Sequence, residues 1–266
     1  MKKIASLVAV ASMTMASASA FANDCPVSHA DLQAALDTAI SVSNGGLDYD
    51  MWGTVVNRDG AVCAVVKSGY TGAAGSSDGV VDPWPGSRVI SAQKANTANA
   101  FSNTDLALST ANVYSAVQPS GSLYGLQHSN PVDTRVAYRG NSSQYGKPND
   151  AMNGLKIGGV NVFGGGLALY NGSGDLVGAV GVSGDTSCAD HNVALRTREA
   201  LVGGNFTIDN IPAGVDGEGT DNITYDNNIQ GGLEAAFNHP VCGFGEPAVN
   251  DTIMTGLGYA PAVVAP

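Results

Sequence analysis

The stretch Asp175-Leu176-Val177-Gly178-Ala179-Val180-Gly181-Val182-Ser183-Gly184 decides the fold. Valine or leucine alternates in it with glycine or alanine, which predicts a strand over 176–182 that is apolar on both faces. Another apolar run, 167–170, precedes it across the turn Asn171-Gly172-Ser173-Gly174, so the two runs predict a hairpin. Because both faces of this hairpin need cover, we expect helices on one face and a neighbouring subunit on the other.

Helix and strand signals continue on both sides of this hairpin. Ser28 and Asp31 have the spacing of a capping box, and the glycines at 45–46 are expected to end the helix that it starts. Two β-rich runs, 51–56 and 61–66, flank an Asp-Gly turn and predict a second hairpin. The other predicted helices are one over 88–101 capped by Ser87, a short one near Asp105, and one from Thr186 or Ser187 to about Leu201.

The first 22 residues have the pattern of a secretory signal peptide. Lys2 and Lys3 form a basic start, an apolar stretch follows, and Ala20-Phe21-Ala22 is a small-x-small cleavage site. A membrane anchor is disfavoured, because no apolar run reaches the roughly 20 residues that a span needs. We therefore expect cleavage near Ala22 and a periplasmic or secreted chain without membrane insertion.

Composition limits the classes of partner. The 266 residues include 35 glycines and only 13% charged residues, which is typical of a turn-rich globular chain. The formal net charge is -11, and loss of Lys2 and Lys3 with the signal peptide makes it -13. Nucleic acid and anionic membranes repel such a chain, so neither is an expected partner.

Four cysteines, Cys25, Cys63, Cys188 and Cys242, follow the signal peptide. An even number of cysteines in an exported chain predicts two disulfides. Three pairings are possible and the sequence does not choose among them, although we favour Cys25 with Cys63 and Cys188 with Cys242. A metal site is disfavoured because no C-x-x-C pair is present.

The chain after residue 22 divides into a domain over 23–202 and an acidic, turn-rich extension over 203–266, which we expect to be irregular and to pack on the domain. Between about 115 and 157 the periodicity gives way to Gly, Ser, Asn and Pro, which predicts a long loop insertion. In the extension, four acidic residues offer oxygen ligands for calcium, but their spacing does not match an EF-hand loop. A solvated acidic loop is the favoured interpretation of Asp216, Glu218, Asp221 and Asp226.

Two glycine-rich motifs are weak evidence for chemistry. The Gly-x-Ser-x-Gly at 75–79 matches serine hydrolases in letters, but it lies in a Gly, Ser and Pro-rich loop rather than at a strand-to-helix turn. The turn at 178–184 could cradle a phosphate, yet Asp185 follows it with a negative charge. Tight packing of a strand against a helix is the better account of that turn.

Several segments together resemble the GlcG/HbpS haem-binding protein family, whose domain is also fused to some corrinoid adenosyltransferases. They are Lys94-Ala95 with Thr97-Ala98 and Phe101, then Gly158-Gly159-Val160, then the stretch 175–184 and the Asp-containing helix start that follows it. The resemblance covers about 28–201. It implies an α+β fold with an antiparallel sheet of about five strands flanked by helices, similar to profilin-like and roadblock-like domains, and assembly into a homo-oligomer.

The resemblance also implies haem as the ligand, held in a mostly apolar groove for uptake, buffering or sensing. Histidine is the commonest protein ligand of haem iron, but the axial ligand varies within the family, so none is carried over. We rank His191 first as the iron ligand, then His128 and His29. His29 and His191 lie at predicted helix starts, which disfavour the charged imidazole. His191 stands where many relatives have an acidic residue.

Two alternatives to haem binding remain open. One is an enzyme that acts on a small organic molecule in the same groove, with Lys94 and Asp190 as the ionisable residues. It requires polar groups that converge on the groove and have a perturbed pKa. The other is a non-catalytic module that binds a partner protein through the acidic extension or the long loop.

Overall fold

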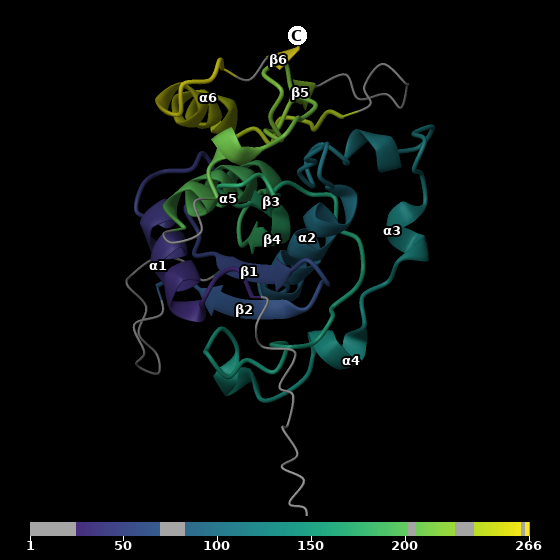
Figure 1. Ribbon diagram of the computed structural model, residues 1–266, viewed down its shortest axis with the longest axis vertical. Coiled ribbons are helices and arrows are strands. Elements are labelled where there is room, and N and C mark those ends of the chain that lie inside the picture. Colours follow the sequence, from purple (N-terminus) through teal and green to yellow (C-terminus); the bar gives the residue numbers. More distant parts are fainter. Residues whose placement is uncertain (1–24, 70–82, 202–205, 227–236, 262–263, 266) are drawn as a thin grey trace, which may run out of the picture.

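A four-stranded antiparallel sheet forms the centre of the protein (Figure 1). The structure is a computed structural model that describes residues 25–69, 83–201, 206–226, 237–261 and 264–265. The strands lie in the order β2-β1-β4-β3, and every neighbouring pair is antiparallel. Their bounds are Trp52–Asn57 for β1, Val62–Lys67 for β2, Gly166–Tyr170 for β3 and Leu176–Ser183 for β4. Both predicted hairpins are confirmed, and the antiparallel α+β fold is as expected, with four strands in the main sheet.

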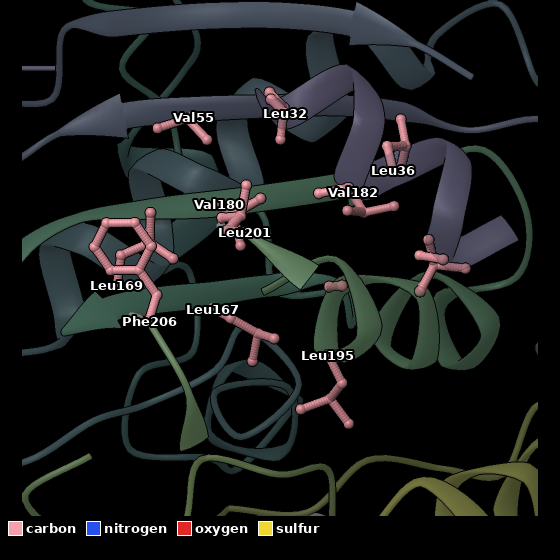
Figure 2. Close-up of a cluster of buried hydrophobic side chains, with 14 of the residues drawn as sticks. Leu32, Leu36, Val55, Leu167, Leu169, Val180, Val182, Leu195, Leu201 and Phe206 are labelled. Carbon is pink, nitrogen blue, oxygen red and sulfur yellow. The ribbon is translucent and has the colours of Figure 1, made fainter. Parts of the chain in front are cut away.

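Two helices cover one face of the sheet. They are α1, His29–Ile40, and α5, Ser187–Ala200. Figure 2 shows Leu32 and Leu36 of α1 gathered with Val180 and Val182 of β4 in the larger apolar core. Helices of this chain cover this face and, as described next, the opposite face as well. The expectation that a neighbouring subunit covers one face is therefore wrong. The apolar alternation showed that cover was needed but not which segment supplies it.

The opposite face carries α2, Ser87–Phe101, which lies unusually close to the sheet. A Cβ atom added at Gly181 would stand 2.0 Å from the carbonyl oxygen of Ser91, and one at Gly166 would stand 2.5 Å from that of Lys94. Only glycine lets the helix backbone approach β3 and β4 so closely. Tight strand–helix packing, rather than a phosphate cradle, is thus the role of the glycines in the deciding stretch.

The helices follow local signals with three exceptions. Ser28 caps α1 by accepting a hydrogen bond from Asp31 N–H, and Thr186 caps α5 in the same way through Ala189 N–H. The first exception is that α1 ends at Ile40, before the expected glycines, because the hydroxyl of Ser41 donates to Thr38 O at its last turn.

The second exception is the short helix expected near Asp105, which does not form. Residues 102–109 are instead a loop in which the Asn103 side chain accepts hydrogen bonds from the N–H groups of Asp105 and Leu106. A side chain that satisfies these donors locally offers the backbone an alternative to a helix. The third exception is that helix α2 begins at Ser87 rather than being capped by it, with Gly86 at the cap position.

The insertion after α2 is built from single helical turns and packs on the sheet. Asp150 forms an ion pair with Arg88 of α2, and both side chains are buried. Met152 and Ile157 are fully buried in the apolar cluster beneath α2. The turns are η1, Ser115–Val117; α3, Leu126–Ser129; α4, Thr134–Ala137; and η2, Ser142–Gln144.

The C-terminal extension is more regular than expected. It contains α6, Glu246–Gly256, which the sequence analysis missed, as well as η3, Ile208–Asn210, and the short parallel pair β5, Tyr225–Asp226, with β6, Val264–Ala265. The buried Glu246 carboxylate accepts hydrogen bonds from the N–H groups of Cys242, Gly243 and Phe244, which fixes the start of α6. Figure 1 shows α6 beside α5, and these two helices are in contact.

Two predicted features lie outside the described residues: the signal peptide over 1–22 and the Gly-x-Ser-x-Gly at 75–79. Among the described helices, none combines the length and apolar character needed to cross a membrane.

Candidate functional site

A cleft opens between the first half of α2 and the N-terminus of α5, and we call it the α2–α5 cleft. Its volume is about 390 Å³. Three of its lining residues are large and apolar, and the others are polar or charged. The described lining residues are Trp84, Ser87, Ile90, Lys94, Phe163, Ser183, Asp185, Thr186, Ser187 and Asp190. A concave site with apolar walls and a few convergent polar groups is typical of small-molecule binding.

A buried ion pair lies at the base of this cleft. Lys94 Nζ lies 2.6 Å from Asp190 Oδ2, and both side chains are almost fully buried. Lys94 also donates to Val182 O, while Asp190 Oδ1 accepts from the N–H groups of Gly184 and Asp185. These contacts connect α2, the end of β4 and the first turn of α5. Sequence reasoning named both residues but could not show that they meet.

Burial moves both members of this pair towards their neutral forms. Desolvation raises the pKa of Asp190 to about 6, against the opposing effect of Lys94. Desolvation likewise lowers the pKa of Lys94, although Asp190 opposes it. Two groups whose pKa values approach each other can exchange a proton at modest cost, which is a property of acid–base sites.

Aromatic side chains form the mouth of the cleft. Trp84 is 49% exposed and Phe163 is 45% exposed. Each is supported from behind by another ring: Tyr49 meets Trp84 edge-on at 6.0 Å, and Tyr114 lies 6.4 Å from Phe163. Exposed rings that are held in place and border a cleft mark a surface for an apolar or aromatic ligand.

Asp185 has a structural role at the cleft. Its carboxylate accepts hydrogen bonds from the N–H groups of Leu47, Tyr49 and Thr186. It therefore ties the loop after α1 to the start of α5. The sequence analysis took the Asp185 charge as an argument against a bound phosphate, and the structure shows that this carboxylate binds backbone N–H groups of the protein instead.

A serine and a histidine meet at the α5 end of the cleft. Ser187 Oγ lies 3.0 Å from Nε2 of His239, which comes from the C-terminal extension. Next to them the disulfide Cys188–Cys242 joins α5 to the extension. The sequence offered no reason to assign His239 a role, because its partner is 52 positions away.

Both favoured disulfides, Cys25–Cys63 and Cys188–Cys242, are present. One cluster has the residue types of a metal site: the sulfurs of Cys188 and Cys242 and a ring nitrogen of His239 lie within 4.8 Å of one another. The sulfurs are bonded to each other and supply no thiolate ligands. The two disulfides indicate a non-cytoplasmic protein.

The first-ranked iron ligand, His191, lies in the core. Its side chain is fully buried, and its Nε2 accepts a hydrogen bond from Ile223 N–H at 3.1 Å. The ring proton therefore belongs on Nδ1, which has no partner among the described residues. Burial lowers the pKa of His191 to about 3, so the ring is neutral. In this arrangement neither nitrogen presents a lone pair to a ligand.

The other two ranked histidines lie on different elements and outside the described lining of the cleft. His29, half-buried in the first turn of α1, donates from Nε2 to Gly146 O at 3.0 Å. His128 is exposed on α3. The structure does not bring His191, His128 and His29 together.

Three of the four acidic residues of this pattern, Asp216, Asp221 and Asp226, accept hydrogen bonds from donors of the protein itself. Asp216 accepts hydrogen bonds from the backbone and hydroxyl of Thr220, and Asp221 forms a buried ion pair with Arg198. Asp226 accepts from the Asn238 side chain. Their carboxylates are committed to different partners, so the arrangement does not favour the calcium site that the acidic pattern raised.

An antiparallel α+β domain with an aromatic-rimmed cleft over a buried ion pair is typical of domains that bind small ligands. Residues 54–199, more than half of the chain, match a family model described as haem degrading protein HbpS-like, and the chain belongs to that family. This agrees with the GlcG/HbpS resemblance found in the sequence.

Two solved structures are similar to the chain. One is the Klebsiella pneumoniae protein ORFY, described with the family DUF336, at 23% identity and a TM-score of 0.43 over 66% of this chain and 91% of that one. The other is a complex of PduOC with haem, at 21% identity and a TM-score of 0.43 over 67% of this chain and 94% of that one. A search of curated proteins found no match.

Proposed function

We propose that this protein is an exported haem-binding protein that serves haem uptake, buffering or sensing and acts as a homo-oligomer. The carrying observation is the pair of exposed, supported rings, Trp84 and Phe163, at the mouth of a cleft inside the region that matches the HbpS-like family. The PduOC structure, titled as a haem complex, supports the same ligand class. Flat apolar walls suit the face of a macrocycle.

The residues of the cleft fit a macrocycle better than they fit its iron. Trp84, Ile90 and Phe163 supply apolar contact, whereas the described lining contains no imidazole. Of the three ranked histidines, His128 is exposed and lies within the family-matched region. Its helix, α3, is anchored through Leu126 to the apolar cluster that includes Tyr114, the ring behind Phe163. None of the three ranked histidines is in the described lining, so the iron ligand is to be assigned by experiment, with His128 tested before His29 and the enclosed His191.

Haemin titration followed at the Soret band tests this proposal. We expect a shift of the Soret band on binding. Trp84→Ala and Phe163→Ala should each bind haemin about tenfold more weakly, because each removes one of the two exposed rings at the mouth of the cleft. Phe244→Ala is the matched control, because Phe244 is equally exposed at 48% but lies outside the cleft. His128→Ala should change the spectrum of the complex. The proposal is refuted if the native protein shows no Soret shift, or if Phe244→Ala weakens binding as much as the two cleft variants.

A second candidate function is an enzyme acting on a small organic molecule in the same cleft. The Lys94–Asp190 pair favours it, because two convergent ionisable groups with perturbed pKa values are what that hypothesis requires. Haem is the first substrate to test, given the family description. With peroxide added as the oxidant, bound haem should then lose its Soret absorbance more slowly in Asp190→Asn than in the native protein. Equal rates, also in a Lys94→Met, Asp190→Asn double variant that leaves no unpaired buried charge, would exclude a role for the pair.

The export and domain boundaries belong to the same proposal. We expect the mature protein to begin near Asn23, followed by a ligand-binding domain to about 202 and a packed extension over 203–266. Peptide sequencing of the N-terminus of protein recovered from outside the cytoplasm tests the cleavage. Light scattering with and without haemin tests the homo-oligomer.

A further inference from the structure

Among the hydroxyl residues of the α2–α5 cleft, Ser187 has a histidine as its hydrogen-bond partner. Its Oγ lies 3.0 Å from Nε2 of His239, within hydrogen-bond distance. Thr186, not Ser187, caps α5, since Thr186 Oγ1 accepts from Ala189 N–H. The Ser187 hydroxyl is therefore not needed to start the helix.

The environment of His239 fixes which ring nitrogen faces the serine. His239 Nδ1 lies 2.7 Å from Pro240 O, and a carbonyl oxygen only accepts, so the ring proton is on Nδ1. The lone pair on Nε2 then points at Ser187 Oγ. A base whose far nitrogen is held by a hydrogen bond, and whose near nitrogen accepts from a hydroxyl, has the arrangement of an activated serine.

Packing holds the imidazole in this position. His239 is 1% exposed, and the Tyr114 ring lies 4.7 Å from it. Its backbone N–H donates to Thr224 O at 2.8 Å, and its carbonyl oxygen accepts from Asp226 N–H at 3.0 Å. The disulfide Cys188–Cys242 ties both neighbouring segments together.

Burial keeps the His239 ring neutral. Burial lowers the pKa of His239 to about 4; the Pro240 carbonyl and Glu246 oppose this effect, and Lys94 adds to it. The ring is thus unprotonated at neutral pH and able to accept a proton.

Donors for a developing oxyanion lie near the serine. Ser187 is the first residue of a 14-residue helix, where backbone N–H groups carry partial positive charge. No described residue accepts a hydrogen bond from Ser187 N–H. Such donors stabilise negative charge that forms on a carbonyl oxygen.

We propose that Ser187 and His239 form a nucleophile–base pair that hydrolyses uncharged carboxylic esters with small apolar or aromatic groups. The substrate class follows from the lining of the cleft. Trp84, Ile90 and Phe163 favour apolar groups, and the carboxylate of Asp185 disfavours anionic substrates.

The reaction has two balanced halves. Ser187 Oγ bonds to the ester carbonyl carbon while its proton passes to His239 Nε2. The carbon–oxygen bond to the leaving alcohol then breaks, and His239 returns the proton to that alcohol, which leaves an acyl group on Ser187. Water attacks the acyl group by the same proton transfers, and the products are a carboxylic acid and regenerated Ser187.

Hydrolysis of p-nitrophenyl acetate by the full-length protein tests the proposal. Ser187→Ala and His239→Gln should each lower kcat/KM at least about a hundredfold. An organophosphorus fluoridate should label Ser187, identified by peptide mass spectrometry, and exposed Ser143 serves as the unlabelled control. The rate should change little between pH 8 and pH 5.5, because the base is already neutral there.

The expected outcome is a covalent adduct at Ser187 and a rate lost in both variants. An unlabelled Ser187 together with equal rates in the native protein and Ser187→Ala would overturn the proposal. Labelling of Ser187 in the native protein depends on neither variant, so it keeps the proposal testable if His239→Gln fails to fold. The proposal stands apart from haem binding, because it is tested by ester hydrolysis and by labelling of Ser187, whereas haem binding is tested by the Soret shift of the native protein.

Discussion

Acidification should destabilise this protein through His239, and the size of the effect can be worked out from the structure. The perturbation is a change from pH 8 to pH 5, compared between the native protein and His239→Gln. Burial lowers the pKa of His239 to about 4 in the folded protein, whereas an unfolded histidine titrates near 6.5. The unfolded chain therefore binds a proton at pH 5 that the folded chain does not bind.

The sign follows from this difference. Because the folded pKa is lowered, the stabilisation is complete above about pH 6.5 and is lost as the pH falls towards 4. At pH 5 the difference corresponds to about 2 kcal/mol of unfolding free energy. Glutamine does not titrate, so His239→Gln should lose about 2 kcal/mol less than the native protein over this range. His191, Asp190 and Lys94 titrate in both proteins and cancel in the comparison.

Urea unfolding of the disulfide-intact proteins at pH 8 and pH 5 measures the effect. The native protein should show the larger drop in unfolding free energy. Equal drops would mean that His239 is protonated in the folded protein or is not buried there, and the reasoning would be refuted.

Two further substitutions test how the core is built. Asp221→Asn leaves the buried guanidinium of Arg198 without its carboxylate and should cost about 3–5 kcal/mol in urea unfolding, whereas a loss under 1 kcal/mol would show that water reaches the pair. Gly181→Ala places a methyl group against the Ser91 carbonyl and should cost at least about 1–3 kcal/mol. Gly217→Ala, where a Cβ would meet nothing within 4 Å, is the matched control and should be nearly neutral.

The sequence predicted those parts of the fold that depend on neighbours along the chain. Ser28 and Thr186 cap their helices because a cap needs only residues within one turn. The two hairpins formed around their predicted turns for the same reason. The helix expected near Asp105 failed because the Asn103 side chain, a local competitor, satisfies the backbone first.

The α6 helix was missed because its start depends on a distant interaction. Glu246 caps three N–H groups of the preceding turn, and that turn is held by the Cys188–Cys242 disulfide. Asn192 of α5 also donates to Glu246 O from 54 positions away. The glycine-rich and acidic composition of the extension carries no information about such distant contacts.

What the sequence determined by itself was the apolar, glycine-rich strand and the need to cover both its faces, because alternation along a strand sets which side each residue takes. Its motifs also identified the family. The tertiary structure alone decided that α1 and α5 supply one cover, that His191 is enclosed, and that Lys94 meets Asp190 while Ser187 meets His239. These pairs lie 96 and 52 positions apart. Contacts at such separations depend on how whole elements pack, and the periodicity of any one segment carries no information about its distant partner.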